Sequence, residues 1–264
     1  MTQALLDPIP IPALFIGFAI VTLICYEVGF RVGRWWQDRE PGEQEGPNDV
    51  LLGSLLALMA FLLAVTAGMA ADRFDARRGT VLDEANAITE VYLRADYLPP
   101  SDAAEMKELL RTYAPLRVAT SDRARIAANI ERSKQLQAEM WAVQARVTAA
   151  GHDSDLNSSF GESLDDLIEL SETRVVQGLY ARVPDTILVL LLLGSALALL
   201  MIGYSAGLKK RRSLISAFVL IFALGIVLVM VVDLDRPQDG FVTVSQQPLI
   251  DVQQMIGPPA TEAS

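Results

Sequence analysis

Four long stretches without a charged residue limit what this chain can fold into more than any other feature. They cover Pro8–Tyr26, Val50–Ala71, Thr186–Leu208 and Ser213–Val232. An α-helix needs roughly 20 residues, at about 1.5 Å per residue, to cross about 30 Å of hydrocarbon. Because backbone polar groups in lipid must pair within their own segment, such stretches predict membrane-spanning helices. We expect these helices at residues 8–30, 50–71, 186–208 and 213–232.

The charged residues are concentrated between the second and third apolar stretches. The whole chain is 52% hydrophobic, 20% charged and has a mean hydropathy of +0.32. Residues 72–185 alone contain 14 Lys/Arg and 20 Asp/Glu and show no alternation typical of strands. We therefore predict an all-α polytopic membrane protein, in which four transmembrane helices flank an inserted soluble helical bundle. Residues 233–264 form a polar C-terminal tail with short apolar patches.

The soluble domain is predicted to continue directly from the second and third membrane helices. The helical pattern runs past Ala71 without a stop signal until Pro99 and Pro100, and only Gly79 interrupts it. Proline ends a helix because it lacks the N–H group and its ring clashes with the preceding turn. At the other end of the domain, Pro184 opens the third membrane helix.

Several classes of function are disfavoured by composition. The net charge of −10 makes nucleic acid a poor partner. The single cysteine, Cys25, excludes an intrachain disulfide and a cysteine-based zinc site. The single histidine, His152, lies in a polar turn, and no catalytic triad, phosphate-binding glycine loop or metal-ligand spacing is present. We expect no enzymatic activity, no cofactor and no metal site.

Positive charge near the short loops predicts the membrane orientation. Residues 31–49 and 209–212 carry seven Lys/Arg between them, including the run Lys209–Arg212. The positive-inside rule places such short loops in the cytoplasm, which leaves both termini and the helical domain outside. Basic residues also flank the membrane on the domain side, and counting them makes the positive charge on the two sides nearly equal. They are Arg73, Arg77, Arg78, Arg174 and Arg182.

The second apolar stretch contains a row of small residues on one helical face, which we call the small-residue seam. Its members are Gly53, Ala57, Ala60, Ala64, Ala67 and Ala71. Small residues allow close approach of another backbone, so one interpretation is helix packing within the bundle or between subunits. The other interpretation is a narrow pore wall around a symmetry axis. Gly203 and Gly207 form one GxxxG pair in the third membrane helix, which is a weak signal alone.

A second group of candidate residues is a set of charges at the domain-side membrane surface, which we call the charge collar. Its members are Asp72, Arg73, Asp75, Arg77, Arg78, Arg182, Asp185, Asp233, Asp235 and Arg236. Mixed charges at helix ends usually pair, so the collar is expected to be a salt-bridge network. The functional alternative is an ion vestibule, in which unpaired carboxylates would concentrate cations.

The helix that follows the second membrane span is polar on several faces. Glu84, Asn86, Tyr92 and Arg94 lie in this segment. A solvated helix would have this pattern, and so would a helix in a polar interface; we expect the interface. Glu27, the one charge near the cytoplasmic end of the first membrane helix, can pair with Arg31 four residues later.

Three segments resemble a known family. The stretch DRFDARRGTVLDEANAITEVYLRADYLP, the segment ESLDDLIELSETRVVQGLYARVP and the tail DLDRPQDGFVTVSQQPL are similar to the bacterial bestrophin-like family of unknown function. The matching residues are Arg73, Arg77, Arg78, Glu84, Asn86, Tyr92, Arg94, Asp235, Arg236 and Pro237. The family is distantly related to bestrophin anion channels, in which the second helix lines the pore. The resemblance implies no catalytic residues.

Two functional hypotheses follow from the residues and the resemblance. The first is a homo-oligomeric ion channel or pore in the lipid bilayer of the cell membrane, through which inorganic ions pass. The second is a non-conducting membrane scaffold or sensor whose soluble helical domain binds a partner. The first rests largely on analogy of fold, which says less about function than a defined site does.

Overall fold

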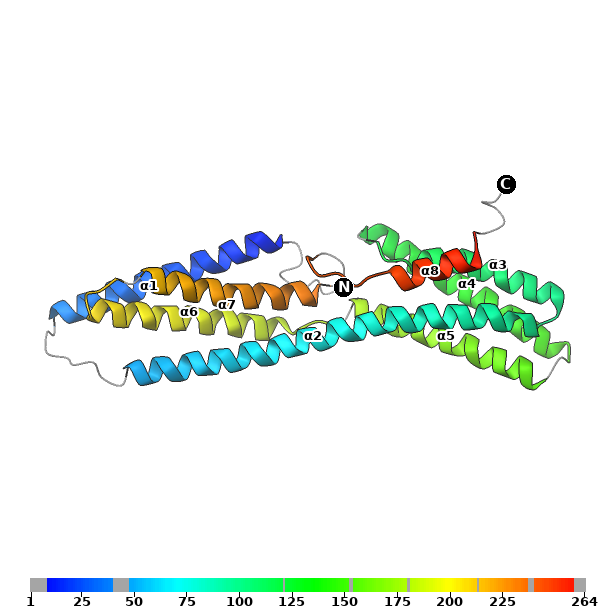
Figure 1. Cartoon of the computed structure of the whole chain (residues 1–264), viewed down its shortest axis with the longest axis horizontal. Helices are drawn as coiled ribbons and strands as arrows, with labels where there is room; N and C mark the ends of the chain where they lie inside the picture. Colours follow the sequence, from blue (N-terminus) through cyan, green and yellow to red (C-terminus); the bar gives the residue numbers. More distant parts are fainter. Residues whose placement is uncertain are drawn as a thin grey trace. The chain divides into compact units, whose positions relative to one another are not determined.

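The computed structural model describes residues 9–39, 48–120, 122–151, 154–179, 181–212, 214–236 and 240–258. All regular structure in these ranges is helical, which confirms the predicted all-α fold. In chain order the helices are α1 (Ile11–Arg39), α2 (Asn48–Arg94), the 3-10 helix η1 (Ala95–Tyr97), α3 (Pro100–Arg117), α4 (Arg123–Ala149), α5 (Asp155–Leu179), α6 (Asp185–Leu208), α7 (Leu214–Asp235) and α8 (Gln247–Ile256) (Figure 1). Residues 40–47 of the predicted short loop at 31–49, together with His152 and Pro237, lie outside the described residues.

The chain divides into two compact units. Among the described residues, the first unit contains those up to Arg73, Arg182–Arg236 and Gly240–Val242, and the second contains Phe74–Ala181 and those from Thr243 onwards. The first unit holds α1, α6, α7 and the first half of α2. The second holds the rest of α2, the helices η1 and α3 to α5, and α8.

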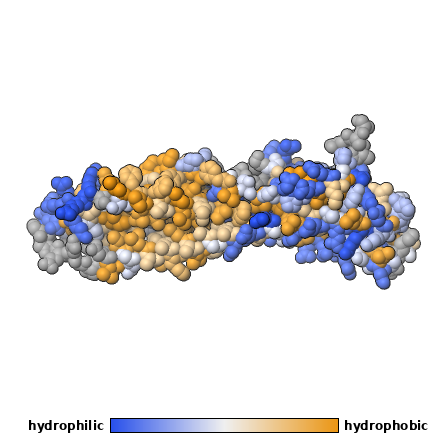
Figure 2. Space-filling view, viewed as in Figure 1, coloured by the Kyte–Doolittle hydropathy of each residue, from blue (hydrophilic) through white to orange (hydrophobic). Residues whose placement is uncertain are grey.

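Four helices of the described chain are long and apolar enough to cross a membrane: Ile11–Arg39, Val50–Tyr97, Asp185–Leu208 and Leu214–Asp235. In the most apolar window of each helix, only 17–33% of residues are buried inside the protein. The outward-facing side chains are therefore mostly apolar, and Figure 2 shows this hydrophobic surface over the first unit. An apolar surface of this extent needs lipid as its solvent, as the four uncharged stretches predict.

Helix α2 has 47 residues, which corresponds to a length of about 70 Å. This length is more than twice the thickness of the hydrocarbon core, so the helix does not end where its apolar stretch ends. The other predicted connection differs in detail. Helix α5 ends at Leu179, and α6 begins at Asp185 with Pro184 as its N-cap, so the backbone between them is not helical.

In the first unit, α1 and α6 pack at very short distance through glycines. A Cβ atom on Gly203 or Gly207 would overlap the carbonyl oxygen of Tyr26 or Phe30, respectively. Gly29 and Gly33 are equally close to the backbone of α6 at Leu200 and Tyr204. Because a step of four residues along α1 matches a step of four along α6, the two helices run parallel. The GxxxG pair of α6 thus packs against a second GxxxG pair in α1.

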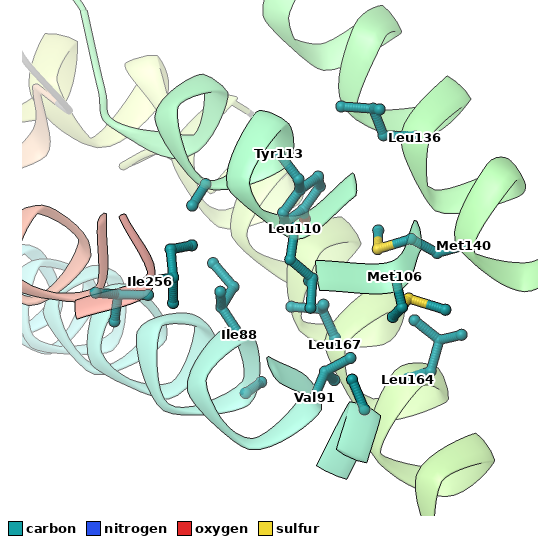
Figure 3. Close-up of a cluster of buried hydrophobic side chains, with 14 of the residues drawn as sticks. Ile88, Val91, Met106, Leu110, Tyr113, Leu136, Met140, Leu164, Leu167 and Ile256 are labelled. Atoms are coloured by element: carbon teal, nitrogen blue, oxygen red, sulfur yellow. The ribbon is translucent and has the colours of Figure 1, made fainter. Parts of the chain in front are cut away.

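The second unit is a helical bundle with a continuous apolar core (Figure 3). Helices α2 to α5 all contribute fully buried side chains, among them Ile88, Met106, Leu136 and Leu167. Helix α8 of the C-terminal tail contributes Leu249, Val252 and Ile256 to the same core. In addition, the Arg111 Nε donates a hydrogen bond to the Ile256 carbonyl oxygen at 2.8 Å. The apolar residues of α8 therefore belong to the bundle, whereas Phe241 and Val242 of the tail lie in the first unit.

The glycine contact between α1 and α6 can be tested by adding one methyl group. We expect Gly203→Ala to lower the stability of the full chain in detergent by about 1–3 kcal/mol, because the added Cβ forces the two backbones apart. Gly17→Ala is the matched control, since a Cβ at Gly17 meets no atom within 4 Å. Thermal unfolding followed by circular dichroism measures both. Equal stability of the two variants would contradict the close contact.

Candidate functional site

The packed face of α2 in the first unit consists of Met59, Leu63, Thr66 and Ala70, all of which are buried. Met59 and Leu63 pack with Leu191 of α6, and the Met59 sulfur lies where a side chain on Gly194 of α6 would be. The Thr66 hydroxyl donates to the Leu62 carbonyl oxygen at 2.7 Å, so this face exposes no unsatisfied polar group. Packing of α2 within the chain uses this face.

The small-residue seam lies on a different face of α2. At 3.6 residues per turn its centre is about 110° from the packed face. Gly53, Ala57, Ala60 and Ala64 are exposed, and Ala67 and Ala71 are half-buried. Large apolar side chains occupy the third face, where Leu58, Phe61 and Val65 are 46–64% exposed. The helix therefore presents two different outward faces, one of large apolar residues suited to lipid and one of small residues.

In the charge collar, Asp235 at the end of α7 is an anchor for residues before α6. Its side chain is 7% exposed and accepts the Val183 backbone N–H at 2.8 Å. The guanidinium groups of Arg73 and Arg182 each lie 3.9 Å from its carboxylate. A buried carboxylate requires such partners, because an unpaired charge away from water is costly. Asp235 thus links α2, α7 and the segment that precedes α6 within the first unit.

Asp233 and Arg236 hold chain segments rather than face open solvent. Asp233 accepts the backbone N–H groups of Phe241 and Val242, at 2.7 and 3.0 Å, and so turns the chain after α7 back on itself. Arg236 donates to the Ile9 carbonyl oxygen at 2.6 Å. Both residues are at least 94% buried. Carboxylates with these contacts are structural anchors.

The other collar residues are placed differently. Asp72, Asp75 and Arg78 are exposed on α2, whereas Arg77 is buried. Of these four residues, only Asp72 belongs to the first unit. Asp185 is half-buried in the first turn of α6, where a negative charge interacts favourably with the helix dipole. The collar residues therefore do not form one continuous ring of solvent-exposed charge. The most buried carboxylates of the collar, Asp233 and Asp235, accept hydrogen bonds from backbone N–H groups.

Within the second unit, Glu84 of α2 is the centre of a buried polar network. Its side chain is completely buried, and its carboxylate pairs with Arg117 of α3 and Arg174 of α5, each at 2.5 Å. The Tyr113 hydroxyl donates to the same carboxylate at 3.3 Å. Two guanidinium groups on one carboxylate compensate the loss of its hydration. Removal of either arginine would leave a buried charge without this compensation and would destabilise the fold.

The network extends through α2, α3, α4 and α5 and reaches the residue before α8. The Gln137 amide of α4 donates to the Tyr113 hydroxyl and to the Ser171 hydroxyl, at 3.2 and 2.8 Å. The Arg174 guanidinium also donates to the Gln246 side chain just before α8, at 2.9 Å. Sequence reasoning predicted a polar interface at Glu84 but none of its partners. A polar residue at a core position, as at Ser171 in the apolar face of α5, is the signal that points to such a network.

The other polar residues predicted on α2 are nearer to solvent. Asn86 is exposed, and Tyr92 and Arg94 are half-buried. The Tyr92 hydroxyl accepts from Arg111 of α3 at 2.9 Å, and Arg94 donates to the Ser159 carbonyl and hydroxyl oxygens of α5, at 2.8 and 2.9 Å. Tyr92 and Arg94 therefore position α3 and α5 against α2.

No group of three or more histidine, cysteine or carboxylate side chains with metal-binding geometry occurs among the described residues. Within that same part of the chain, the arrangement provides helix contacts, a buried ion-pair network and one unoccupied face of small residues.

A family model described as the Bestrophin-like domain matches residues 16–249. A comparison with curated protein sequences finds no match. Among solved structures, a bacterial bestrophin homologue from Klebsiella pneumoniae carrying one substitution is similar, with a TM-score of 0.66 and 12% identity over 93% of this chain and 97% of that chain. Another structure of a K. pneumoniae homologue has a TM-score of 0.62 and 13% identity, over 91% and 97% of the two chains.

A third structure, described only as a membrane protein, has a TM-score of 0.65 and 13% identity, and covers 93% of this chain and 97% of that chain. At such low identity these similarities extend to the fold alone. The arrangement of helices is therefore shared with bacterial bestrophin homologues.

The buried tyrosine of the network predicts an alkaline limit to stability. Burial raises the pKa of Tyr113 above its ordinary value of 10.0, because the phenolate loses its hydration. Below pH 10 the phenol is neutral in both states; above it the unfolded chain ionises first, so stability falls as pH rises toward the folded-state pKa. We expect Tyr113→Phe to remove a slope of up to about 1.4 kcal/mol per pH unit.

Urea unfolding between pH 8 and pH 12, measured on wild type and variant, gives this difference. Tyr97→Phe serves as the control, because the Tyr97 side chain is exposed on η1. Identical pH profiles for wild type and Tyr113→Phe would contradict the role given to burial.

Proposed function

Because this chain belongs to the bestrophin-like family, we propose that it forms a homo-oligomeric ion channel or pore in the cell membrane. The observation that carries the proposal is the small-residue seam of α2. It is exposed along Gly53–Ala64, although α2 packs against α6 and α7 through another face. Side chains the size of alanine leave room for an ion path when several copies of one helix surround an axis.

A single copy does not supply enough helices for such a path. The first unit has four candidate spans, and α1 and α6 are in direct backbone contact, which leaves no room between them. A path lined by α2 therefore requires the α2 helices of several chains. Cyclic symmetry is the usual arrangement of such assemblies.

The charge collar contributes less to ion attraction in this proposal than its composition suggests. Asp233 and Asp235 are occupied by backbone N–H groups and arginines. Only the exposed residues, such as Asp72 and Asp75, are available to a passing cation. Selectivity is therefore not assigned to the collar.

We also propose an orientation from the basic residues of the short loops. The run Lys209–Arg212 and the basic end of α1 support a cytoplasmic position for these loops, with the helical unit and both termini outside. Reporter fusions at residue 150 and at the C-terminus test it. Activity only from a reporter that works in the cytoplasm would reverse the orientation.

The channel proposal is tested by flux through vesicles that contain the purified full chain. We expect flux of monovalent ions, and we expect Ala60→Phe to reduce it severalfold by filling the space beside the seam. Leu58→Phe is the matched control, since Leu58 is on the large apolar face and 52% exposed. The mass of each variant in detergent establishes that assembly is unchanged.

Absence of flux for both cations and anions, across pH and with or without Ca²⁺, would contradict conduction. The second candidate, a scaffold or sensor, would then be favoured. Exposed apolar side chains on the helical unit support it, because Trp141, Leu156 and Val176 are 45–55% exposed there.

A further inference from the structure

The turn between α6 and α7 contains four consecutive basic residues, Lys209–Arg212, in a tight helix-terminating conformation. The Arg211 N–H bonds to the Ala206 carbonyl oxygen at 3.2 Å, and Lys210 has a positive φ of 52°. Helices of this type usually end with glycine or asparagine at the positive-φ position, because other side chains are strained there. Lys210 therefore occupies a backbone conformation that is unfavourable for its side chain.

Two of these basic residues are paired with α1. Lys210 pairs with Asp38 at 2.6 Å, and Arg212 contacts both oxygens of Glu27 at 2.8 and 3.0 Å. The Arg212 guanidinium also lies over the Phe30 ring, 4.5 Å from its centroid. Glu27 and Asp38 therefore fix the turn against the end of α1.

Arg34 of α1 and Arg211 of the turn are both exposed, and neither has an acidic partner within ion-pair distance among the described residues. Their backbones are close neighbours. The Arg34 backbone nitrogen lies 2.8 Å from the position of a Cβ on Gly207, and the Arg211 backbone N–H bonds to the carbonyl oxygen of Ala206, the residue before Gly207. Two exposed arginines without an ion pair among the described residues thus lie at neighbouring points of the first unit, and the Asp38 carboxylate interacts with Arg34 only at longer range.

This end of the first unit has the features of a membrane–water boundary. Helix α1 has 29 residues, about 43 Å, and so exceeds the hydrocarbon thickness. Val32 and Trp35 remain exposed beyond Glu27, and the Arg39 guanidinium lies 4.1 Å from the centroid of the Trp35 ring. In Figure 2 hydrophilic residues gather at the end of the hydrophobic surface. Exposed tryptophans next to arginines are typical of the headgroup level.

We propose that Arg34 and Arg211 bind the phosphate of an anionic phospholipid headgroup. A guanidinium group donates two parallel hydrogen bonds to phosphate oxygens, and it does so more strongly where water is scarce. A zwitterionic choline headgroup carries a cation beside its phosphate, which two arginines repel. A headgroup with net negative charge, such as phosphatidylglycerol, fits the pair better.

The proposed preference for anionic lipid depends on two particular residues rather than on the net charge of this end of the first unit. The two short connections and helix ends contain seven Lys/Arg, from Arg31 to Arg212, against Glu27, Asp38 and the acidic residues Glu40, Glu43, Glu45 and Asp49. Such a near balance gives little long-range attraction. Selectivity for anionic lipid should therefore depend on Arg34 and Arg211 in particular.

The native tryptophans provide the test. Two of the three, Trp35 and Trp36, lie beside Arg34, so Trp141→Phe leaves reporters only at the proposed site. The full chain is reconstituted in mixed vesicles in which either phosphatidylglycerol or phosphatidylcholine carries brominated acyl chains, which quench nearby tryptophan. We expect stronger quenching by the brominated phosphatidylglycerol. In Arg34→Gln/Arg211→Gln the lipid preference falls roughly fivefold or more.

Arg125→Gln/Lys134→Gln is the matched control, because it removes two exposed positive charges from α4 and leaves the turn intact. It should retain the wild-type preference. Arg34→Lys/Arg211→Lys keeps both charges, and it should retain part of the preference; this variant decides the question if the glutamine variant does not fold.

Three results would overturn the proposal. One is equal quenching of the wild-type reporter by the two brominated lipids. The second is equal loss of preference in the α4 control. The third is displacement of the lipid by inorganic phosphate but not by sodium chloride of equal ionic strength, which would assign the two arginines to a free anion.

Discussion

The interior of a bilayer offers no hydrogen-bonding partner to the peptide backbone, and this constraint governs the first unit of the protein. Four stretches of the chain must be helical there, and their outward faces must be apolar. Because lipid provides little hydrophobic force between helices, contact between them depends on close packing of small residues. The parallel glycine pairs of α1 and α6 meet this requirement by bringing two backbones into contact.

Charge is used where the chain leaves this apolar solvent. Asp233 and Asp235 at the end of α7 bind backbone N–H groups and arginines, so they fix the segments that enter and leave the first unit. At the other ends of the helices, Glu27 and Asp38 hold the basic turn before α7. In the helical unit, Glu84 with its two arginines performs a similar task for α2, α3, α5 and the segment before α8. These ion pairs and hydrogen bonds fix one arrangement of the helices within each unit.

Much of this architecture could be predicted from the sequence, because transmembrane helices depend on long uncharged runs that are visible without a structure. The absence of a stop signal after Ala71 likewise predicts the long α2. Contacts between distant segments could not be predicted. Gly29 and Gly33 have a GxxxG spacing, but the sequence does not say that they pack against Gly203 and Gly207.

For the candidate site, too, the sequence predicts which residues share a helix face but not which segments they contact. Helical periodicity places the small-residue seam on one face, but only the structure shows that α2 packs against α6 through Met59 and leaves the first four seam residues, Gly53–Ala64, exposed. A composition of mixed charge predicts pairing in the collar without saying that Asp233 binds backbone rather than arginine. For the Glu84 network, the sequence indicates a polar interface, whereas its partners come from four other segments separated by up to 162 residues of chain.

The small-residue face of α2 is the feature on which the functional proposal depends, and its exposure to water can be measured directly. Single cysteines are placed at Ala57, Ala60 and Ala64, and at Leu58, Phe61 and Val65, in a Cys25→Ser background. The full chain in vesicles is then treated with a membrane-impermeant methanethiosulfonate reagent. Modification at the three alanine positions, with none at the three positions on the large apolar face, is the predicted result. Modification of the large apolar face, or of neither face, would contradict a water-filled path along α2.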